Sequence, residues 1–346
     1  MGTPITNILV SKEIMLEDLK GKTLAVDSFN MLYQFLSSIR QVDGAPLMDS
    51  KGRVTSHLTG LFNRITKLMI EDIKFVFVFD GEVPELKKKE RERRKKLKLE
   101  ATHLYEEAKQ KEDLEDMKKY ASRTSVLNEE MIEEAKKLIK ALGMPIVDAP
   151  SEGEAQASFM VEKGDCYAVV SQDTDSLVFG APLVVKNLTI SGRRKAINKL
   201  TYKTVNPELV SLSESLNKLG INQEQLIIIA MLAGTDYNIG GVKGIGPKKA
   251  INLVLTYGND YDKLFKETDW SNNFEFEWQE VFYLIKNMPV KKDYKLKWET
   301  IDREAIIHLL VEEHDFNKER VKKTLNKLMK GKPSKDQKAL SDFFKR

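Results

Sequence analysis

Cysteine is nearly absent from this chain of 346 residues, and histidine occurs only four times. The single cysteine, Cys166, rules out an internal disulfide and indicates a reducing compartment, and we expect its side chain to be buried. The histidines lack the spacing of metal ligands, which argues against a zinc site. No apolar run is long enough to cross a bilayer, and no signal-peptide pattern is present. We therefore expect a soluble intracellular protein without a membrane partner, in the cytoplasm or nucleoid, or in the nucleus of a eukaryote.

Three short apolar runs rich in Val and Phe each end at acidic residues. The runs are Thr23–Asp27, Lys74–Asp80 and Tyr167–Asp175. This composition is typical of strands buried on both faces, as in a parallel sheet. The ligand crevice of such a sheet lies at the carboxyl ends of its strands. Carboxylates gathered there repel one another unless cations are bound, and oxygen ligands suit Mg²⁺. The sequence therefore predicts a magnesium site that includes Asp27, Asp80, Asp173 and Asp175.

The order of the patterns predicts the fold class. Strands alternate with helical patterns from about Thr23 to Val185, which indicates an α/β fold with a central, mostly parallel sheet flanked by helices. Helices are expected over 55–70, 128–142 and 223–232, with Gly143 as the stop signal of the second. From Asp260 onward the pattern is helical. The chain is long enough to bury a large core.

The overall charge is small, but its distribution is uneven. The 56 basic residues face 52 acidic ones, so the net charge is only +4. Within Lys87–Lys98, however, nine basic and two acidic residues give a local charge of +7 (9 − 2). Taken alone, such a run is typical of a solvated helix or a disordered insertion. Because it begins soon after Asp80, it instead favours a polyanionic substrate held over the metal site.

Two glutamates, Glu152 and Glu154, allow two interpretations. Ser151 and Glu154 match a capping box, S-x-x-E, that would begin the following helix. Alternatively, both glutamates supply further oxygen ligands. The acidic pair Asp173 and Asp175 follows about twenty residues later and can share one face of an extended segment, which favours the second interpretation.

Asp236 follows an apolar helix and completes a set of seven carboxylates, although an ordinary helix-terminal turn also explains it. So much like charge in one crevice requires cations. Two divalent ions would neutralise most of it and would stabilise both the attacking and the leaving oxygen of a phosphodiester hydrolysis. The sequence contains no Ser–His–Asp or Cys–His arrangement that competes with this chemistry.

The segment from Gly240 to Ala250 reads G-G-V-K-G-I-G-P-K-K-A. Its glycines allow close backbone approach, and Pro247 pre-sets the first turn of a helix. The N–H groups at that helix start can bind a phosphate. This pattern indicates a helix-hairpin-helix type motif that binds the DNA backbone without reading bases, and a plain glycine turn is the alternative. The DNA-binding residues predicted here are Gly244, Gly246, Lys248 and Lys249.

The carboxyl-terminal segment contains the spacing Q-x-x-L-x-x-F-F after a Gly/Pro/Ser break at 331–334. Two adjacent exposed Phe side chains are unfavourable unless they dock on a surface. The spacing matches the peptide that binds sliding clamps of DNA replication, and packing against the protein's own core is the alternative. The predicted clamp-binding residues are Gln337, Leu340, Phe343 and Phe344.

Together these motifs resemble those of the flap endonuclease family of structure-specific 5′ nucleases. The resemblance runs in order from D-S-F-N-M-L-Y-Q-F through V-F-D-G, D-A-P-S-E-G-E-A, Q-D-T-D and G-I-G-P-K-K-A to the clamp motif. The sequence has no basic extension after that motif, so it is more similar to archaeal members. The resemblance implies cleavage of 5′ flaps of branched DNA in replication (Okazaki fragment maturation) and repair, with 5′–3′ exonuclease activity.

The resemblance also implies roles for individual residues. Lys87 and Arg94 would be catalytic cations at the base of a basic helical arch. Tyr33 and Arg40 would contact DNA, Tyr33 by stacking on a base. Two Mg²⁺ ions, replaceable by Mn²⁺, would be cofactors, and K⁺ would bind at the glycine-rich hairpin. The metal-site carboxylates would include Asp27. Asp80, Glu152 and Glu154 would lie nearer one ion, and Asp173, Asp175 and Asp236 would lie nearer the other.

The implied partners are branched DNA and a sliding clamp (PCNA), and we expect a monomer when the protein is free. The expected regions are an N-terminal nuclease region (1–102), the rest of the arch (103–119), an internal nuclease region (120–261), a helical C-terminal part (262–330) and a clamp-binding tail (331–346). One alternative is a related 5′ exonuclease or junction-cutting nuclease. Another is a non-catalytic DNA and clamp adaptor, which leaves the acidic strand ends unexplained.

Overall fold

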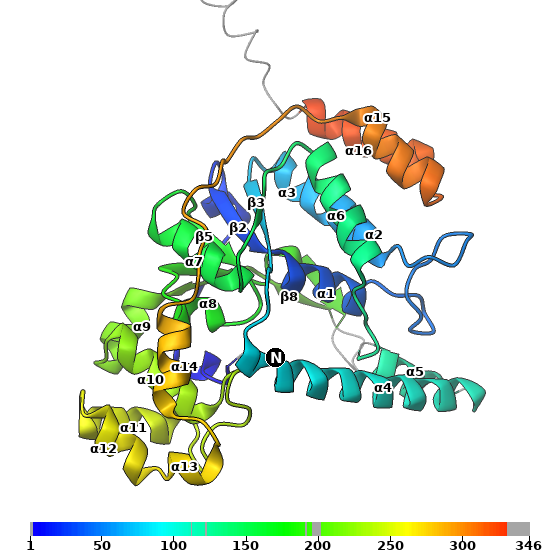
Figure 1. Cartoon of the computed structure of the whole chain (residues 1–346). Coiled ribbons are helices and arrows are strands. Elements are labelled where there is room, and N and C mark those ends of the chain that lie inside the picture. Colours follow the sequence, from blue (N-terminus) through cyan, green and yellow to red (C-terminus); the bar gives the residue numbers. More distant parts are fainter. Residues whose placement is uncertain (1–2, 112, 122, 191, 196–201, 331–346) are drawn as a thin grey trace, which may run out of the picture.

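A seven-stranded sheet lies at the centre of the computed structural model, which describes residues 3–111, 113–121, 123–190, 192–195 and 202–330 (Figure 1). The strand order is β1-β9-β6-β5-β2-β3-β4. Strands β6, β5, β2, β3 and β4 are parallel to one another, whereas β9 runs antiparallel to both β6 and β1. The predicted α/β fold with a mostly parallel sheet is therefore confirmed. The strands are β1 (Ser11–Glu13), β2 (Thr23–Asp27), β3 (Lys74–Phe79), β4 (Ile146–Asp148), β5 (Ala168–Val170), β6 (Leu183–Lys186) and β9 (Glu208–Ser211).

Helices cover both faces of this sheet, which explains why strand β3 is apolar at every position after Lys74. Phe75, Phe77 and Phe79 enter the hydrophobic cluster on one face, while Val76 and Val78 enter the cluster on the other. The cluster on the phenylalanine face takes in residues of α1 (Ser28–Ser38), α2 (Ser56–Gly60), α3 (Thr66–Ile70), α6 (Glu129–Ala141), α15 (Arg303–Ile307) and α16 (Lys318–Lys330). The cluster on the valine face takes in residues of α7 (Gly153–Glu162), α8 (Asp175–Val178), α10 (Gln223–Ala233), α11 (Pro247–Tyr257) and α14 (Trp278–Lys286).

The helices expected from the sequence are present. The segment 55–70 is helical in three consecutive pieces, because a π-helical stretch, Leu61–Ile65, separates α2 from α3. Asn128 caps α6 by accepting a hydrogen bond from the Met131 N–H at 2.8 Å. Gly143 ends that helical region with φ of 76°, a conformation that favours glycine. Cys166 is 4% exposed, which confirms its expected burial.

The basic segment is an ordered helix rather than a disordered insertion. After a short 3₁₀ turn at Glu85–Lys87, α4 (Lys88–Gln110) extends away from the sheet and packs against α5 (Leu114–Ala121) (Figure 1). Most of its side chains are exposed. The amino-terminal end of α4 is the part nearest the carboxyl ends of the strands, so its first cations can reach the predicted crevice.

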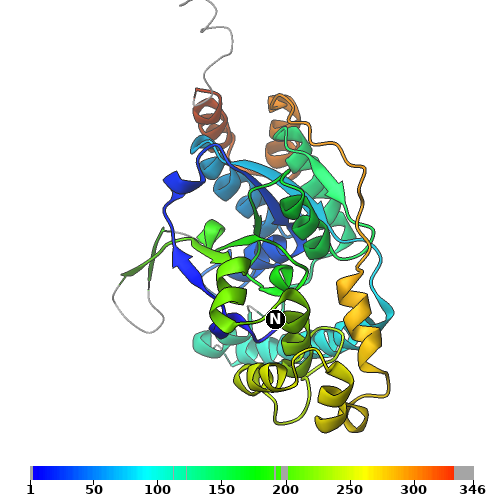
Figure 2. The same ribbon diagram turned by 90° about the vertical axis from the view of Figure 1, so that its left-hand side faces the viewer.

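The described residues after Asp260 contain helices and loops but no strand, as expected. They include α12 (Tyr261–Glu267), α13 (Trp270–Asn273), α14, α15, a π-helical turn (His308–Glu313) and α16. A separate two-stranded hairpin, β7 (Gly192–Lys195) and β8 (Tyr202–Val205), projects from the side of the molecule (Figure 2). The other elements are α9 (Leu212–Leu219) and 3₁₀ turns at Thr6–Ile8, Leu16–Leu19 and Leu188–Ile190. No helix among the described residues is both long and apolar enough to cross a membrane.

Candidate active site

Two of the predicted carboxylates are fixed by the chain that follows the central strands. Asp27 ends β2 and caps α1, because its Oδ1 accepts a hydrogen bond from the Asn30 N–H at 3.1 Å. Asp80 follows β3, and its Oδ1 accepts a hydrogen bond from the Gly153 N–H at 2.7 Å. A Cβ atom at position 153 would lie 2.5 Å from that oxygen, so the approach requires glycine. Both carboxylates therefore lie at the carboxyl end of the sheet, as the strand pattern predicts.

The capping-box interpretation of Ser151 and Glu154 is wrong. Helix α7 begins at Gly153 with Glu152 as its N-cap, and the Glu152 side chain makes no capping hydrogen bond. Ser151 Oγ instead donates to the Glu82 carbonyl oxygen at 2.9 Å. Glu154 Oε1 accepts hydrogen bonds from Ser171 Oγ at 3.1 Å and Ser176 Oγ at 3.4 Å. Tertiary contacts beyond α7 thus hold the Glu154 carboxylate among the other acidic residues.

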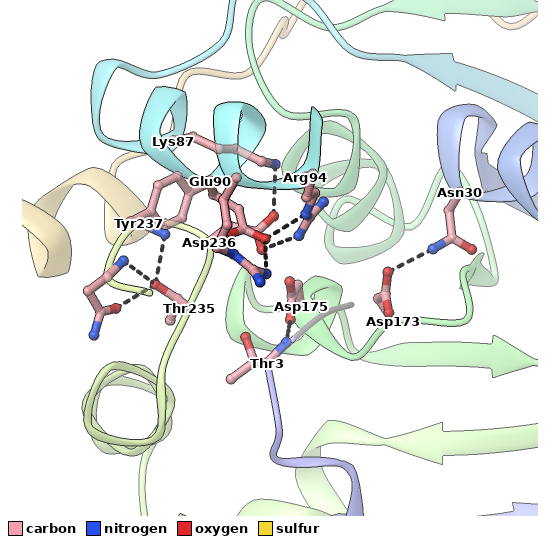
Figure 3. A network of polar contacts seen from close by, with 12 residues as sticks. Thr3, Asn30, Lys87, Glu90, Arg94, Asp173, Asp175, Thr235, Asp236 and Tyr237 are labelled. Carbon is pink, nitrogen blue, oxygen red and sulfur yellow. Dashed lines mark hydrogen bonds and ion pairs between the residues drawn. The ribbon is translucent and has the colours of Figure 1, made fainter. Parts of the chain in front are cut away.

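Asp173 and Asp175 are held by residues that the sequence reasoning missed. Asn30 Nδ2 donates to Asp173 Oδ2 at 2.8 Å, and the backbone N–H of Thr3 donates to Asp175 Oδ1 at 2.7 Å (Figure 3). Asn30 lies three positions after Asp27, so its place on the first turn of α1 was a usable signal. Nothing local in the sequence indicates that the amino-terminal segment reaches Asp175.

Burial makes several carboxylates of this crevice reluctant to ionise, and repulsion between carboxylates adds to the effect at Asp27 and Glu154. Burial, followed by the charge of Asp80, raises the pKa of Asp27 well above its usual value. Burial, with the charges of Asp175 and Asp27, does the same to the pKa of Glu154. Burial raises the pKa of Asp175 to about 6, and it also raises the pKa of Asp80 and of Glu152. These carboxylates are therefore close enough together to shift one another's pKa.

Two cations from the basic segment contact carboxylates of this crevice. Lys87 Nζ lies 2.6 Å from Glu152 Oε2 and 3.4 Å from Asp236 Oδ2. Arg94 Nη2 lies 2.5 Å from Asp236 Oδ1 (Figure 3). Burial by itself lowers the pKa of Lys87, but the Glu152 and Asp236 carboxylates outweigh it and raise that pKa.

These groups border a narrow cavity with a volume of about 20 Å³, room for one or two water molecules. The buried phenol of Tyr237, which the sequence reasoning did not single out, also borders it. Burial and the surrounding carboxylates raise the pKa of Tyr237 well above its usual value, so the phenol stays protonated and can donate a hydrogen bond. The lining residues are Thr3, Lys87, Glu152, Glu154, Asp175, Val178, Phe179, Thr235, Asp236, Tyr237 and Ile285.

The donor set suits hard divalent cations, although their coordination sphere is not assembled. The carboxylates supply only oxygen ligands, and burial with neighbouring carboxylates raises the pKa of Asp27 and of Glu154, so bound cations would stabilise their ionised forms. Among the described residues, however, no three His, Cys, Asp or Glu side chains converge closely enough to hold one ion. Lys87 and Arg94 contact the carboxylates instead. The assignment of seven metal ligands therefore stays a prediction.

The structure places the predicted DNA-binding residues in two regions. Tyr33 is half-buried on α1, with Lys98 Nζ 4.4 Å from the centre of its ring. Arg40 lies near the end of α1, and its guanidinium donates to Leu36 O, Gly44 O and Ser125 Oγ at 3.0, 2.9 and 2.7 Å. Its hydrogen bonds thus brace a loop.

The glycine-rich hairpin has the expected geometry. It connects α10 to α11, which pack against each other. Gly246 is the N-cap of α11, and Pro247 occupies its first turn, as predicted. Gly244 has φ of 77°, and space is open around both glycines. Lys248 and Lys249 are exposed beside them.

The four clamp-motif residues, Gln337, Leu340, Phe343 and Phe344, lie outside the described residues.

Comparison with known proteins identifies the class to which this fold and crevice belong. Residues 4–101 match the XPG N-terminal domain and residues 143–236 match the XPG I-region, so the chain is a protein of the XPG class. It is 51% identical to flap endonuclease 1 of Pyrococcus furiosus, with 100% of each chain covered. The structure of flap endonuclease-1 from Methanococcus jannaschii matches with a TM-score of 0.74 at 44% identity, over 95% of this chain and 98% of that one. The catalytic core of Rad2 in complex with DNA substrate matches with a TM-score of 0.69 at 26% identity, over 95% and 100%. The chain belongs to the flap endonuclease family.

Proposed function

We propose that this protein is a Mg²⁺-dependent nuclease that hydrolyses a phosphodiester near the base of a 5′ single-stranded flap in branched DNA. Its roles would be Okazaki fragment maturation in replication and DNA repair, with 5′–3′ exonuclease activity on related ends. Membership of the flap endonuclease family supports the reaction class. The observation that carries the proposal is one cavity lined by carboxylates from separate segments of the chain and by the ammonium of Lys87. These carboxylates are Glu152, Glu154, Asp175 and Asp236.

The residues of this crevice would divide the work between metal binding and charge stabilisation. Asp27, Asp80, Glu152, Glu154, Asp173, Asp175 and Asp236 would hold two Mg²⁺ ions, with Mn²⁺ as a substitute. When bound, these ions would stabilise the attacking and leaving oxygens of the hydrolysis. Lys87 and Arg94 would offset negative charge that develops on the scissile phosphate, since both already reach the crevice from the basic segment.

Substrate recognition would depend on phosphate contacts and on the shape of a branch rather than on base sequence. Backbone N–H groups at Gly244 and Gly246 would hold the backbone of the duplex, with Lys248 and Lys249 beside them. K⁺ would bind between this hairpin and a phosphate. Tyr33 would stack on a base near the cut. Arg40 would contact DNA after giving up part of its loop hydrogen bonding.

The remaining proposals concern assembly. The tail, 331–346, would bind a sliding clamp through Gln337, Leu340, Phe343 and Phe344. The regions 1–102 and 120–261 would form the nuclease, with the arch completed by 103–119 and a helical part at 262–330. We propose that the free protein is a monomer that acts inside the cell.

A cleavage assay on defined junctions tests the proposed reaction. A 5′-flapped duplex is incubated with Mg²⁺ and the wild-type protein or Asp175→Ala. We expect wild-type cleavage near the flap base and a loss of several orders of magnitude in the variant. Asp293→Ala is the matched control, because it removes an exposed carboxylate from a loop outside the crevice. Equal products from wild type and Asp175→Ala would reject the site, and preferential cutting of nicks or four-way junctions would reject the substrate.

A further inference from the structure

Glu90 is a buried carboxylate on the strongly basic helix α4. Only 3% of its surface is exposed. Helix α4 is described throughout, and its other buried residues are Ala101 and Ala108. Removing a carboxylate from water is unfavourable unless it is paired and hydrogen-bonded. Little water reaches the Glu90 carboxylate, so its charge must be stabilised by hydrogen bonds and ion pairs within the protein.

The partners of Glu90 are two arginines of the same helix. Glu90 Oε2 accepts a hydrogen bond from Arg93 Nε at 2.6 Å. Glu90 Oε1 accepts hydrogen bonds from Arg93 Nη2 at 2.8 Å and from Arg94 Nε at 2.7 Å. The other side of the same Arg94 guanidinium reaches the crevice, where Nη2 lies 2.5 Å from Asp236 Oδ1 (Figure 3). One planar group is thus held at Nε by Glu90 and at Nη2 by Asp236.

We propose that Glu90 is a positioning residue that fixes the Arg94 guanidinium at the crevice where the scissile phosphate binds. This inference rests on the proposed function. An arginine side chain has many rotamers, and holding it in one of them before the substrate arrives lowers the entropic cost of each contact it makes. The side chain of Arg94 is 36% exposed, so without Glu90 only the ion pair with Asp236 would oppose its rotation into solvent. The spacing of four residues places both side chains on one face of the helix.

A positioning role and a simple charge effect predict opposite results. Glu90 reduces the positive charge of α4, so its neutralisation strengthens attraction for the DNA backbone. If charge were all that mattered, removal of Glu90 would leave turnover unchanged and tighten binding. If Glu90 positions Arg94, the same change lowers turnover although binding is equal or tighter. The two readouts separate because misplacement of a catalytic group acts on the chemical step.

The first experiment compares Glu90→Gln with Glu92→Gln in single-turnover flap cleavage. Both variants remove one negative charge from α4, but Glu92 is exposed. We expect Glu90→Gln to lower the rate constant about 10- to 100-fold with equal or tighter DNA affinity in Ca²⁺, and Glu92→Gln to change the rate less than about twofold. Glu90→Asp keeps the charge but draws the carboxylate back, so it should lower the rate without tightening binding. Equal rates for Glu90→Gln and Glu92→Gln would overturn the proposal.

A double-mutant cycle then identifies the arginine through which Glu90 acts. In an Arg94→Ala background, Glu90→Gln should cause no further loss of rate beyond about twofold, because the group that it positions is gone. In an Arg93→Ala background, Glu90→Gln should lower the rate constant by the same factor as in the wild type. A full further loss in the Arg94→Ala background would overturn the proposal. Absence of wild-type flap cleavage would instead reject the proposed function, so the two failures are distinguishable.

Discussion

Lys87 Nζ lies 2.6 Å from Glu152 Oε2, and this ion pair joins the basic segment to the acidic crevice. The ammonium therefore contacts a carboxylate that we assign to a metal ion. Such a contact has two consequences. It partly neutralises the acidic crevice, and, if Glu152 is a metal ligand as proposed, it would loosen when a divalent cation binds the Glu152 oxygens. On the proposed assignment, the basic segment and the metal would therefore be coupled through shared carboxylates.

This coupling predicts that Lys87→Ala binds divalent cations more tightly than the wild type but cleaves more slowly. Removal of a like charge from the crevice should tighten Mn²⁺ binding about tenfold, equivalent to ~1.4 kcal/mol. Loss of a cation from the transition state should lower turnover about 10²- to 10³-fold at saturating metal. Calorimetry without DNA and single-turnover assays measure the two effects. Lys88→Ala is the control, since that side chain is exposed and pairs with Glu85. Unchanged Mn²⁺ affinity in Lys87→Ala would show that the ammonium does not compete.

We expect Asp175→Asn to stabilise the metal-free protein while it abolishes cleavage. The folded pKa of Asp175 is about 6, whereas the ordinary value is 3.8. Between these pH values the folded chain binds more protons than the unfolded chain, so stability falls as pH rises from about 4 to about 6 and stays lower above. At pH 8 without metal, neutralisation should add about 3 kcal/mol to the free energy of unfolding.

Urea denaturation in EDTA at pH 5 and pH 8 measures this effect. The advantage of Asp175→Asn should be larger at pH 8, and Mg²⁺ should reduce it because the ion neutralises the wild-type carboxylate. The asparagine oxygen can still accept the Thr3 N–H bond, so that contact is kept. Asp293→Asn serves as the surface control. A variant less stable than the wild type at pH 8 would contradict the electrostatic argument.

The hairpin predicts a change in the salt dependence of DNA binding. Lys248→Ala with Lys249→Ala should weaken binding to all duplex sequences alike and reduce the slope of log K against log salt by about 2. The control pair is Lys291→Ala with Lys292→Ala, which removes the same charge from two adjacent exposed lysines in a loop. Fluorescence anisotropy at several salt concentrations measures both slopes. Equal slopes for the two double variants would remove the hairpin from the interface.

A buried histidine network should contribute to stability but not to cleavage. His314 Nδ1 lies 3.0 Å from Asp49 Oδ2, and its Nε2 lies 2.9 Å from Glu134 Oε1, off the line of a straight hydrogen bond. His314→Ala would remove one partner from each of two carboxylates, while Asp49 keeps Arg53 and Glu134 keeps His57, so it should lower the free energy of unfolding by about 2 kcal/mol. His308→Ala is the control, since that ring is exposed. Turnover per folded molecule should be unchanged in both. Equal stability of the two variants would show that the network contributes little.

The carboxyl-terminal motif predicts a binding defect that leaves catalysis intact. Phe343→Ala with Phe344→Ala should weaken clamp binding at least about 100-fold, since it removes two large apolar anchors from one peptide. Cleavage of a flap without the clamp should be unchanged. Ser341→Ala is a control within the same segment. Calorimetry with the purified clamp measures the affinity, and equal affinity of the double variant and the wild type would remove the assignment.

The sequence by itself determined the elements and the kinds of chemistry. The uninterrupted apolar run of β3 predicts a strand buried on both faces, because neither face of a covered parallel sheet meets water. Pro247 and the preceding glycines predict the start of α11, because proline fixes φ at the first helical position and glycine permits the turn before it. The acidic residues after the strands predict a crowded crevice, because parallel strands bring their carboxyl ends to one edge.

Only the tertiary structure decided which distant groups contact one another. Ser151 and Glu154 fit a local capping rule, but each bonds to a distant partner instead. Ser151 donates to the Glu82 carbonyl oxygen, and Glu154 accepts a hydrogen bond from Ser171. Thr3 holds Asp175 across 172 positions of sequence, and His57 and His314 both reach Glu134. Local sequence fixes backbone preference within a turn or two, whereas the partner of a buried polar group is set by the packing of segments that fold together from far apart.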